Sequence, residues 1–309
     1  MNSIVITGAT SLIGIGLCEY LLSYTDITIY AVCRPGSNSL KRLPTNNKLK
    51  IIFANLENIL RVEDHVTQAD TFINLAWDST DHEGRNNAKL QELNVEYAKE
   101  AMRLAARLGC KLFVEAGSQA EYGFVPGLIG EETPCNPEVE YGRAKLRVLE
   151  EGILLCKNLG LKYLHLRIFS VFGENDRPWT LIMSSIEKLL KSETLELSSC
   201  QQNWNYLYVT DCAKQIVLLS DYALEKIDFI FDVFHIASND TRQLKDYVEE
   251  MRSVLKSPSE IHYGSFIPPR QVSLNPSVLK TERAIGFTNQ IHFADALKII
   301  INKKYNIQL

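Results

Sequence analysis

The chain lacks a hydrophobic run that could cross a membrane. Its longest apolar runs, such as 29–33 and 216–219, are far shorter than the roughly 20 residues that a membrane-spanning helix needs. A basic segment with a cleavage site is also missing before the strand-like run Ser3–Thr7, which argues against a secretory signal. We therefore expect a cytoplasmic protein that does not bind membranes.

Closely spaced cysteines and a surplus of basic charge are missing as well. The seven cysteines include no Cys-x-x-Cys pair, so the sequence predicts reduced, mostly buried thiols and no metal site. Lysine and arginine number 33 against 37 aspartates and glutamates, a net charge of -4, which offers no broad attraction to nucleic acid. With 46% hydrophobic and 23% charged residues, the composition is typical of one large globular domain or two closely associated ones.

Strand-like and helix-like segments alternate through the first half of the chain. Short apolar runs predict strands at 2–7, 27–33, 49–53, 71–76, 111–116 and 161–169. Helical spacing follows the first strand at 13–22, and the segments 86–108 and 138–158 predict two long helices. Repeated β-α-β units of this kind predict an α/β fold with a Rossmann-type, doubly wound parallel sheet.

A glycine-bearing turn joins the first strand to the first helix. The sequence from Thr7 reads Thr-Gly-Ala-Thr-Ser-Leu-Ile-Gly. Small residues at this place let the backbone approach a pyrophosphate, while the helix N-terminus offers free N–H groups and the positive end of its dipole. The turn therefore predicts a dinucleotide site that includes Gly8, Thr10, Ser11, Leu12, Ile13 and Gly14.

The turn resembles the TGxxGxxG fingerprint of the extended short-chain dehydrogenases, which include nucleotide-sugar epimerases, dehydratases and ketoreductases. Ser11 stands at the place of the middle glycine, where a serine can keep the turn if its φ is negative. Further segments match the family pattern in order, and Asn55 stands where the family has an adenine-contacting Asp. The resemblance implies that the cofactor is also contacted by Asn55, Leu56, Leu75, Ala76, Trp77 and Asn94.

The end of the second strand bears on the choice between NAD and NADP. An acid at this position binds the 2'-hydroxyl of NAD, whereas a cation suits the 2'-phosphate of NADP. Here the chain reads Cys33-Arg34-Pro35, with no acid nearby and with Ser37, Lys41 and Arg42 as additional donors. The sequence therefore predicts NADP(H), bound in part by Arg34, in preference to NAD.

The organisation of the chain changes beyond Gly173, where prolines separate shorter elements. We expect a dinucleotide-binding domain over residues 1–169, to which the chain returns near 205–223 and 232–237. A smaller and discontinuous C-terminal lobe, formed mainly by 170–204 and 238–309, is expected to bind the substrate.

A tyrosine and a lysine on one helix face suggest proton transfer. Tyr141 and Lys145 are four residues apart, which places both side chains on the same face of a helix. The positive charge of the lysine stabilises the tyrosinate, so proton transfer to or from a carbonyl or carbinol oxygen becomes feasible near neutral pH. Ser118 lies just after the predicted strand 111–116, in a segment that resembles the SSxxxYG signature of the family. The resemblance implies that Ser118 hydrogen-bonds the substrate oxygen that Tyr141 protonates.

The two residues that follow the candidate serine help to distinguish between the possible reactions. Family dehydratases carry Asp-Glu directly after the catalytic Thr, whereas this chain has Gln119 and Ala120, so a dehydratase is not expected. Reduction of a 4-keto sugar, in many cases a 6-deoxy sugar, needs only hydride from NADPH and a proton from Tyr141, and we favour it. A nucleotide-sugar 4-epimerase is the alternative, and a non-catalytic NADP-binding module is a remote third.

The substrate implied by the family is a nucleoside-diphosphate sugar. The segment from Arg167 resembles RxFNxYG with Ser170 in place of the Asn, and the segment from Asn203 resembles RDFxYVxD with Trp204 at the Arg position. The predicted substrate-binding residues are Ser118, Gln119, Ser170, Arg177, Trp204 and Arg270. Family members also pair through their two long helices, and by analogy we expect a homodimer joined through 86–108 and 138–158.

Overall fold

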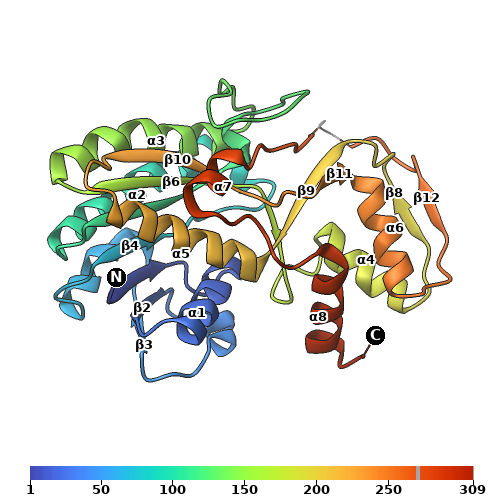
Figure 1. Ribbon diagram of the computed structural model, residues 1–309, viewed down its shortest axis with the longest axis horizontal. Coiled ribbons are helices and arrows are strands. Elements are labelled where there is room, and N and C mark those ends of the chain that lie inside the picture. The colour runs from blue at the N-terminus through green and yellow to red at the C-terminus, as the bar shows by residue number, and fades with distance from the viewer. Residues whose placement is uncertain (269–271, 309) are drawn as a thin grey trace.

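Seven parallel strands form the central sheet of the protein. The computed structural model describes residues 1–268 and 272–308. The sheet has the strand order β10-β6-β5-β4-β1-β2-β3 (Figure 1). Its strands are β1 (Ser3–Thr7), β2 (Thr28–Cys33), β3 (Leu49–Phe53), β4 (Thr71–Asn74), β5 (Leu112–Ser118), β6 (Lys162–Ile168) and β10 (Phe231–Ile236). The predicted doubly wound parallel sheet is confirmed.

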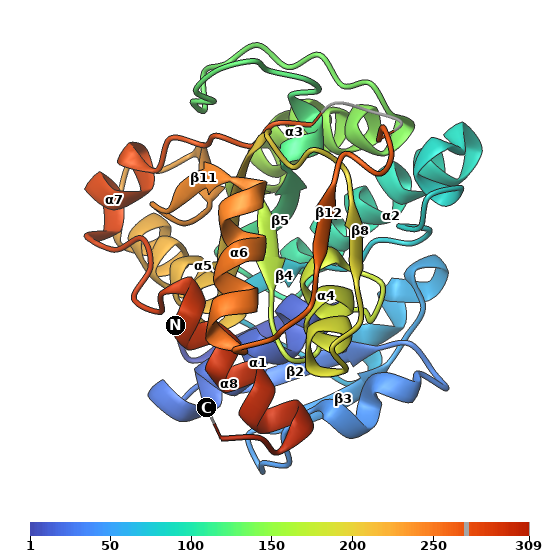
Figure 2. The ribbon, with the colours of Figure 1, turned by 90° about the vertical axis from the view of Figure 1, so that its right-hand side faces the viewer.

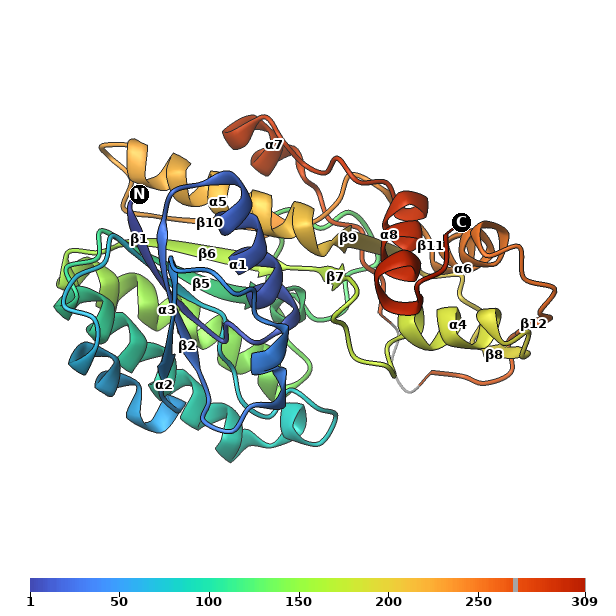
Figure 3. The same ribbon diagram turned by 90° about the horizontal axis from the view of Figure 1, so that it is seen from below.

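Helices cover both faces of this sheet, so its central strands are buried on two sides and are rich in apolar residues. Helices α1 (Leu12–Tyr24) and α5 (Val209–Glu225) lie on one face, and α2 (Ala88–Arg107) and α3 (Glu140–Leu159) lie on the other (Figure 3). Strand β1 shows the alternation: Ile4 and Ile6 pack into the α1/α5 core, while Val5 packs into the α2/α3 core. This three-layer packing fixes the carboxyl ends of β1, β4 and β5 relative to one another.

A smaller lobe lies beyond the end of this sheet, on the right in Figure 1, and faces the viewer in Figure 2. It contains a three-stranded sheet ordered β11-β9-β7 and a two-stranded sheet of β12 and β8. Its core includes a cluster of aromatic rings that brings together Phe172, Tyr206, Tyr247 and Phe293. The elements of the lobe are β7 (Ser170–Phe172), α4 (Leu181–Leu190), β8 (Leu195–Leu197), β9 (Asn203–Tyr208), β11 (Thr241–Gln243), α6 (Leu244–Val254), β12 (Ile261–Tyr263) and α8 (Phe293–Tyr305).

The chain passes between the two parts more than once. After β9 it returns through α5 and β10 to the large sheet, and then enters the lobe again at β11. Helix α7 (Leu279–Ile285), within the segment 238–309 that we expected in the lobe, packs against α5 and β10 instead. The predicted domain limits themselves stay a prediction.

Two global features of the described residues bear on function. None of their helices is long and apolar enough to span a membrane. All seven cysteines are unpaired, six of them are buried, and Cys135 is half-buried.

Candidate active site

The glycine turn is held by contacts that leave no room for side chains. Gly8 has a φ of +65°, and a Cβ on it would lie 2.9 Å from the backbone nitrogen of Ala76. A Cβ on Gly14 would lie 2.3 Å from the carbonyl oxygen of Gly8. Ser11 has a φ of -76°, and its hydroxyl accepts a hydrogen bond of 3.0 Å from the Gly14 N–H. The serine therefore keeps the turn and caps α1 where the family pattern has a glycine.

A cavity of about 780 Å³ opens at the carboxyl ends of the strands. The turn before α1, the ends of β2, β3 and β4, and the segment after β7 all contribute to its wall. Most of the predicted cofactor residues line it, namely Gly8, Thr10, Ser11, Leu12, Ile13, Arg34, Asn55, Leu56, Leu75, Ala76 and Trp77. The other predicted cofactor residues, Gly14, Asn94, Tyr141 and Lys145, are not among the lining residues. The predicted Ser118 and Gln119 do not line the cavity either.

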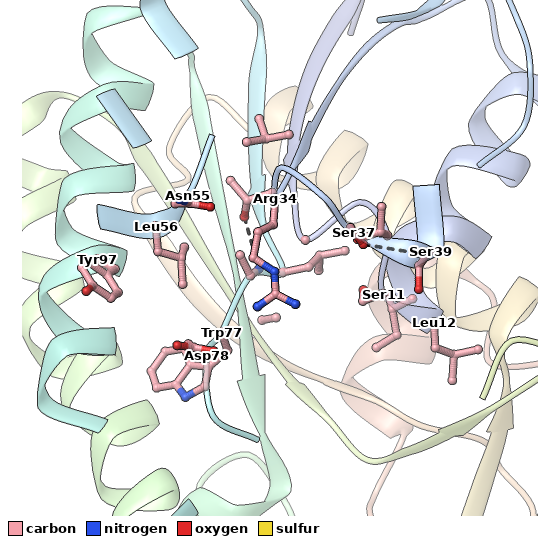
Figure 4. A pocket seen from close by; sticks show the side chains of 18 of the residues that line it. Ser11, Leu12, Arg34, Ser37, Ser39, Asn55, Leu56, Trp77, Asp78 and Tyr97 are labelled. Carbon is pink, nitrogen blue, oxygen red and sulfur yellow. Dashed lines mark hydrogen bonds between the residues drawn. The ribbon is translucent and has the colours of Figure 1, made fainter. Parts of the chain in front are cut away.

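One end of the cavity carries positive charge. Arg34 extends into it from the end of β2 (Figure 4), and Arg42 of the 3-10 helix η1 (Asn38–Arg42) lines it as well. Within the described part of the chain, neither arginine pairs with a carboxylate, and the hydroxyls of Ser37 and Ser39 lie in the same wall. Lys41 does not line the cavity. Two unpaired guanidinium groups beside two hydroxyls can bind a phosphate group.

Polar residues on the buried face of α2 hold the segment that follows β4. Asn94 accepts a hydrogen bond of 2.9 Å from the Asp78 N–H and donates one of 3.1 Å to the Asp78 carbonyl. Gln91 accepts a hydrogen bond of 2.8 Å from the Trp77 indole and donates one of 2.8 Å to the Gly84 carbonyl. Asn94 therefore positions the cavity wall without lining it. The sequence analysis missed Gln91, although its helical spacing with Asn94 and Val95 was a signal that it lies on the buried face.

Tyr141 and Lys145 both contact Trp77 at the end of β4. The Lys145 ammonium lies 3.5 Å from the centroid of the Trp77 ring, and the Tyr141 ring meets the Trp77 ring edge to face at 5.9 Å. Arg85 lies over the Tyr141 ring, with its guanidinium 4.4 Å from the ring centroid. Trp77, a wall residue of the cavity, is therefore the common neighbour of the predicted proton donor and its lysine.

Lys145 is itself buried and ion-paired. Its ammonium lies 3.1 Å from a carboxylate oxygen of Glu115 and donates a hydrogen bond of 2.6 Å to the Ala116 carbonyl. The other carboxylate oxygen of Glu115 accepts 2.7 Å from the Asn74 amide, and Asn74 in turn accepts 2.6 Å from the Thr7 hydroxyl. This buried chain connects Lys145 to the glycine turn. An acid inside the apolar strand β5 was the signal for Glu115, and the sequence analysis did not use it.

Ser118 directly precedes the 3-10 turn η4 (Gln119–Glu121), and Glu121, the last residue of that turn, holds Ser118 in place. Its hydroxyl accepts 3.1 Å from the Ala120 N–H, and its own N–H donates 2.7 Å to the Glu121 carboxylate. Glu121 is fully buried and also binds His165 at 3.0 Å and Arg167 at 2.7 Å. Burial by itself would raise the pKa of the Glu121 carboxyl, but His165 and Arg167 outweigh burial and lower that pKa to about 2. The Glu121 carboxylate therefore accepts the hydrogen bond that holds Ser118 in place.

The predicted substrate residues are spread over several places. Arg177 lines the cavity and donates 2.8 Å to the Thr80 hydroxyl, which links the lobe to the segment after β4. Ser170 pairs with Tyr206 between β7 and β9, and Gln119 is half-buried in η4. The buried indole N–H of Trp204 has no hydrogen-bond partner among the described residues. Arg270 lies outside the described residues.

The fold and site together define a dinucleotide-binding α/β protein with its cavity at the carboxyl ends of the parallel strands. The sequence model of the NAD dependent epimerase/dehydratase family matches residues 4–230. This chain therefore belongs to that family, whose members are NAD(P)-dependent enzymes acting on nucleotide sugars.

The chain is similar to several proteins of known sequence or structure, but the sequence identities are low. The "Uncharacterized UDP-glucose epimerase YtcB" of Bacillus subtilis (strain 168) is 22% identical over 95% of this chain and 98% of its own length. The dTDP-4-dehydro-6-deoxyglucose reductase of Escherichia coli is 24% identical over 70% of this chain and 68% of its own. The UDP-glucuronic acid 4-epimerase of Bacillus cereus, solved with UDP-glucuronic acid and NAD, superposes with a TM-score of 0.82. It is 18% identical, with 98% of this chain and 99% of that one covered, which shows the fold.

Proposed function

We propose that this protein reduces the ketone of a nucleotide-linked 4-keto sugar, such as a 4-keto-6-deoxy sugar, with NADPH as the reductant. The observation that carries the proposal is the pair of unpaired arginines, Arg34 and Arg42, in the cavity wall after β2. A 2'-phosphate distinguishes NADPH from NADH, and two guanidinium groups with adjacent hydroxyls match its charge and geometry. The relative from Escherichia coli, a reductase of this substrate class by name, is in keeping with the proposal.

The residues present fit a dinucleotide. The close approach of Gly8, Gly14 and Ala76 leaves bare backbone at the N-terminus of α1, which suits a pyrophosphate. The cofactor, when bound, would supply the hydride. On the protein side, Tyr141 gives a proton to the carbonyl oxygen of the sugar, and Ser118, fixed by Glu121, orients that oxygen. Lys145 is held in place by Glu115, and Arg177 is the candidate cation for the diphosphate of the substrate.

A 4-epimerase is the second candidate. YtcB, which carries the name of an epimerase, matches this chain along almost its whole length. Epimerisation also needs the same proton transfer at the sugar oxygen, but the oxidised cofactor must then stay bound through each cycle. A module that binds NADP without catalysis would have no use for Ser118, Tyr141 and Lys145 together. A homodimer formed through α2 and α3 stays a prediction.

We expect the purified protein to oxidise NADPH when 4-keto-6-deoxy sugars linked to different nucleoside diphosphates are added. The loss of NADPH absorbance would be followed for each sugar, and mass spectrometry would identify any nucleotide that co-purifies. A reductase releases its oxidised cofactor after each turnover, so the protein should be isolated without tightly held NAD. Retained NAD together with conversion of a UDP-hexose, without net NADPH consumption, would identify an epimerase instead.

Arg34→Asp should weaken NADP(H) binding by more than about tenfold, a loss of about 1.4 kcal/mol, and should spare NAD(H). The reason is that the substitution removes the guanidinium that faces the 2'-phosphate. It introduces a carboxylate, whose negative charge repels the phosphate. Dissociation constants for both cofactors can be measured by calorimetry. Lys41→Asp is the matched control, because it makes the same change of charge outside the cavity wall. An equal loss for both cofactors would remove Arg34 from the 2'-phosphate.

A further inference from the structure

We propose that Trp77 is a positioning residue that acts through Lys145. Its ring holds the Lys145 ammonium in place beside the cofactor cavity. The inference rests on the proposed function, in which Lys145 supports both the binding of the cofactor and the proton transfer by Tyr141. The sequence predicted that Trp77 contacts the cofactor directly, and a role through the lysine is a different one.

The Trp77 ring contacts both the cavity and the Lys145 ammonium. It belongs to the cavity wall, and Figure 4 shows it among the lining side chains. The ammonium lies 3.5 Å from the ring centroid, which is contact distance for a cation over the face of an indole. Lys145 itself does not line the cavity, and its side chain is only 3% exposed. The ring is therefore the part of the wall that covers the ammonium.

The ring face takes the place of a third hydrogen-bond acceptor. A lysine ammonium has three N–H groups, and two oxygens of the described residues accept from it, the Glu115 carboxylate at 3.1 Å and the Ala116 carbonyl at 2.6 Å. A buried N–H without a partner is costly, and the electron-rich face of Trp77 gives the third one an electrostatic partner. Because a ring face binds an N–H less tightly than an oxygen does, that N–H stays available to a hydroxyl of the cofactor.

Trp77 is itself held at three points. Its indole N–H donates 2.8 Å to the side-chain oxygen of Gln91, which is 1% exposed. The backbone N–H groups of the residues before and after it donate 3.2 Å to the Thr7 hydroxyl and 2.9 Å to the Asn94 side chain. A ring fixed in this way can restrain a lysine, whose four-carbon stem has many rotamers to choose from.

The same ring also contacts Tyr141, but it matters more to the lysine. The Tyr141 ring packs edge to face against Trp77 at 5.9 Å, and Lys145 follows four residues later on the same face of α3. Without Trp77 the tyrosine keeps a short and stiff side chain on a packed helix. The longer lysine side chain loses the partner on its cavity side, where water can then reach the ammonium. Removal of the ring should therefore act mainly on Lys145.

The first test needs neither cofactor nor substrate. Reductive methylation of the full-length protein, followed by mass spectrometry of the fragment that contains Lys145, measures how accessible this amine is. In the unchanged protein Lys145 should stay unmodified while exposed lysines such as Lys298 react. Trp77→Leu should make Lys145 react almost as fast as those exposed lysines. Trp77→Phe keeps a ring face and should protect it. Tyr24→Leu, which removes an exposed ring on α1, is the control and should change nothing.

The second test is the affinity for NADPH, measured by calorimetry without a sugar. Trp77→Leu should weaken binding about tenfold, as expected for a cation–π contact out of water, and Trp77→Phe should recover most of the loss. If the ring acts through Lys145, its removal has little left to disturb once the lysine is gone. In a Lys145→Met background, Trp77→Leu should therefore cost less than about twofold.

Three outcomes would overturn the inference. Unchanged methylation in Trp77→Leu would show that the ring does not hold the ammonium. Losses that multiply in the double variant would mean that the ring acts on the cofactor directly. A gain in NADPH affinity in Trp77→Leu would make the ring a barrier in front of the lysine. The methylation of Lys145 does not depend on the reaction, so it stands whether or not the protein reduces a keto sugar.

A second variant covers the case in which Trp77→Leu does not fold, as urea denaturation would show. Gln91→Leu frees the edge of the indole and leaves the ring in the chain. It should increase the methylation of Lys145 and weaken NADPH binding, both by less than Trp77→Leu is expected to do. Methylation and affinity equal to those of the unchanged protein would contradict the proposed anchoring of the ring.

Discussion

A Tyr141→Phe variant should lose roughly 10²- to 10⁴-fold in kcat while binding NADPH nearly as tightly as the unchanged protein. The phenol hydroxyl supplies the proton in the proposed reaction, and general acid catalysis typically accelerates a reaction by a factor of this size. The ring itself, which contacts Trp77 and lies under Arg85, is kept in phenylalanine. Packing and the cofactor cavity should therefore be unchanged, and the loss should fall on the chemical step.

Steady-state kinetics and NADPH binding would be measured side by side. Tyr24→Phe, at an exposed position on α1, removes the same atom from the surface and should change neither. Ser118→Ala should lower turnover with little effect on the cofactor. Lys145→Met should lose turnover together with cofactor affinity. If Tyr141→Phe kept more than about half of kcat, with hydride transfer shown to be rate-limiting by deuterated NADPH, the proposed mechanism would be wrong.

Glu121→Gln should lower the free energy of unfolding by about 3–5 kcal/mol, the cost of breaking a buried ion pair from one side. The substitution leaves the buried Arg167 guanidinium without its carboxylate and changes the partner of His165. Urea denaturation at neutral pH would measure the loss. Glu92→Gln is the control, because it breaks an exposed pair with Arg147, and pairs of that kind contribute about 0–1 kcal/mol.

The pH dependence of stability tests the same residue independently. Folding lowers the pKa of the Glu121 carboxyl from 4.5 to about 2, so the folded state releases this proton more readily than the unfolded state does. The stability that Glu121 contributes is therefore complete above about pH 4.5 and is lost as the pH falls toward 2. Glu121→Gln should show a flatter decline over that window. Parallel curves for the variant and the unchanged protein would mean that another group is responsible.

The sequence predicts the scaffold well because the scaffold depends on local patterns. Apolar runs predicted the strands of the large sheet, and the glycine turn could be placed from its neighbours alone. The segment 86–108 was predicted as a helix and is helical over Ala88–Arg107, because the Asn87 side chain caps its start. Strand β5 continues two residues past the predicted end at 116, because pairing with β6 extends to Ser118 and Ile168.

The chemistry around the site depends on contacts between distant elements, and periodicity does not carry that information. Lys145 and Glu115 are thirty positions apart in sequence, and they meet only because α3 packs on β5. The Glu121 carboxylate binds His165 and Arg167, which are more than forty positions away in the sequence, on β6. The sequence did not reveal that it also holds the Ser118 backbone. Arg85, which lies over the Tyr141 ring, belongs to the short 3-10 turn η3 (Gly84–Asn86), where no spacing rule singles out a residue.

The burial of the cysteines sets how the protein responds to oxidants. Burial raises the pKa of all seven thiols, for example to about 12 in Cys18, Cys110 and Cys156. Peroxide and disulfide reagents react with the thiolate and need access to the sulfur. At neutral pH almost none of these sulfurs is ionised, and most are out of reach of solvent. We therefore expect these thiols to react slowly with peroxide while the protein is folded.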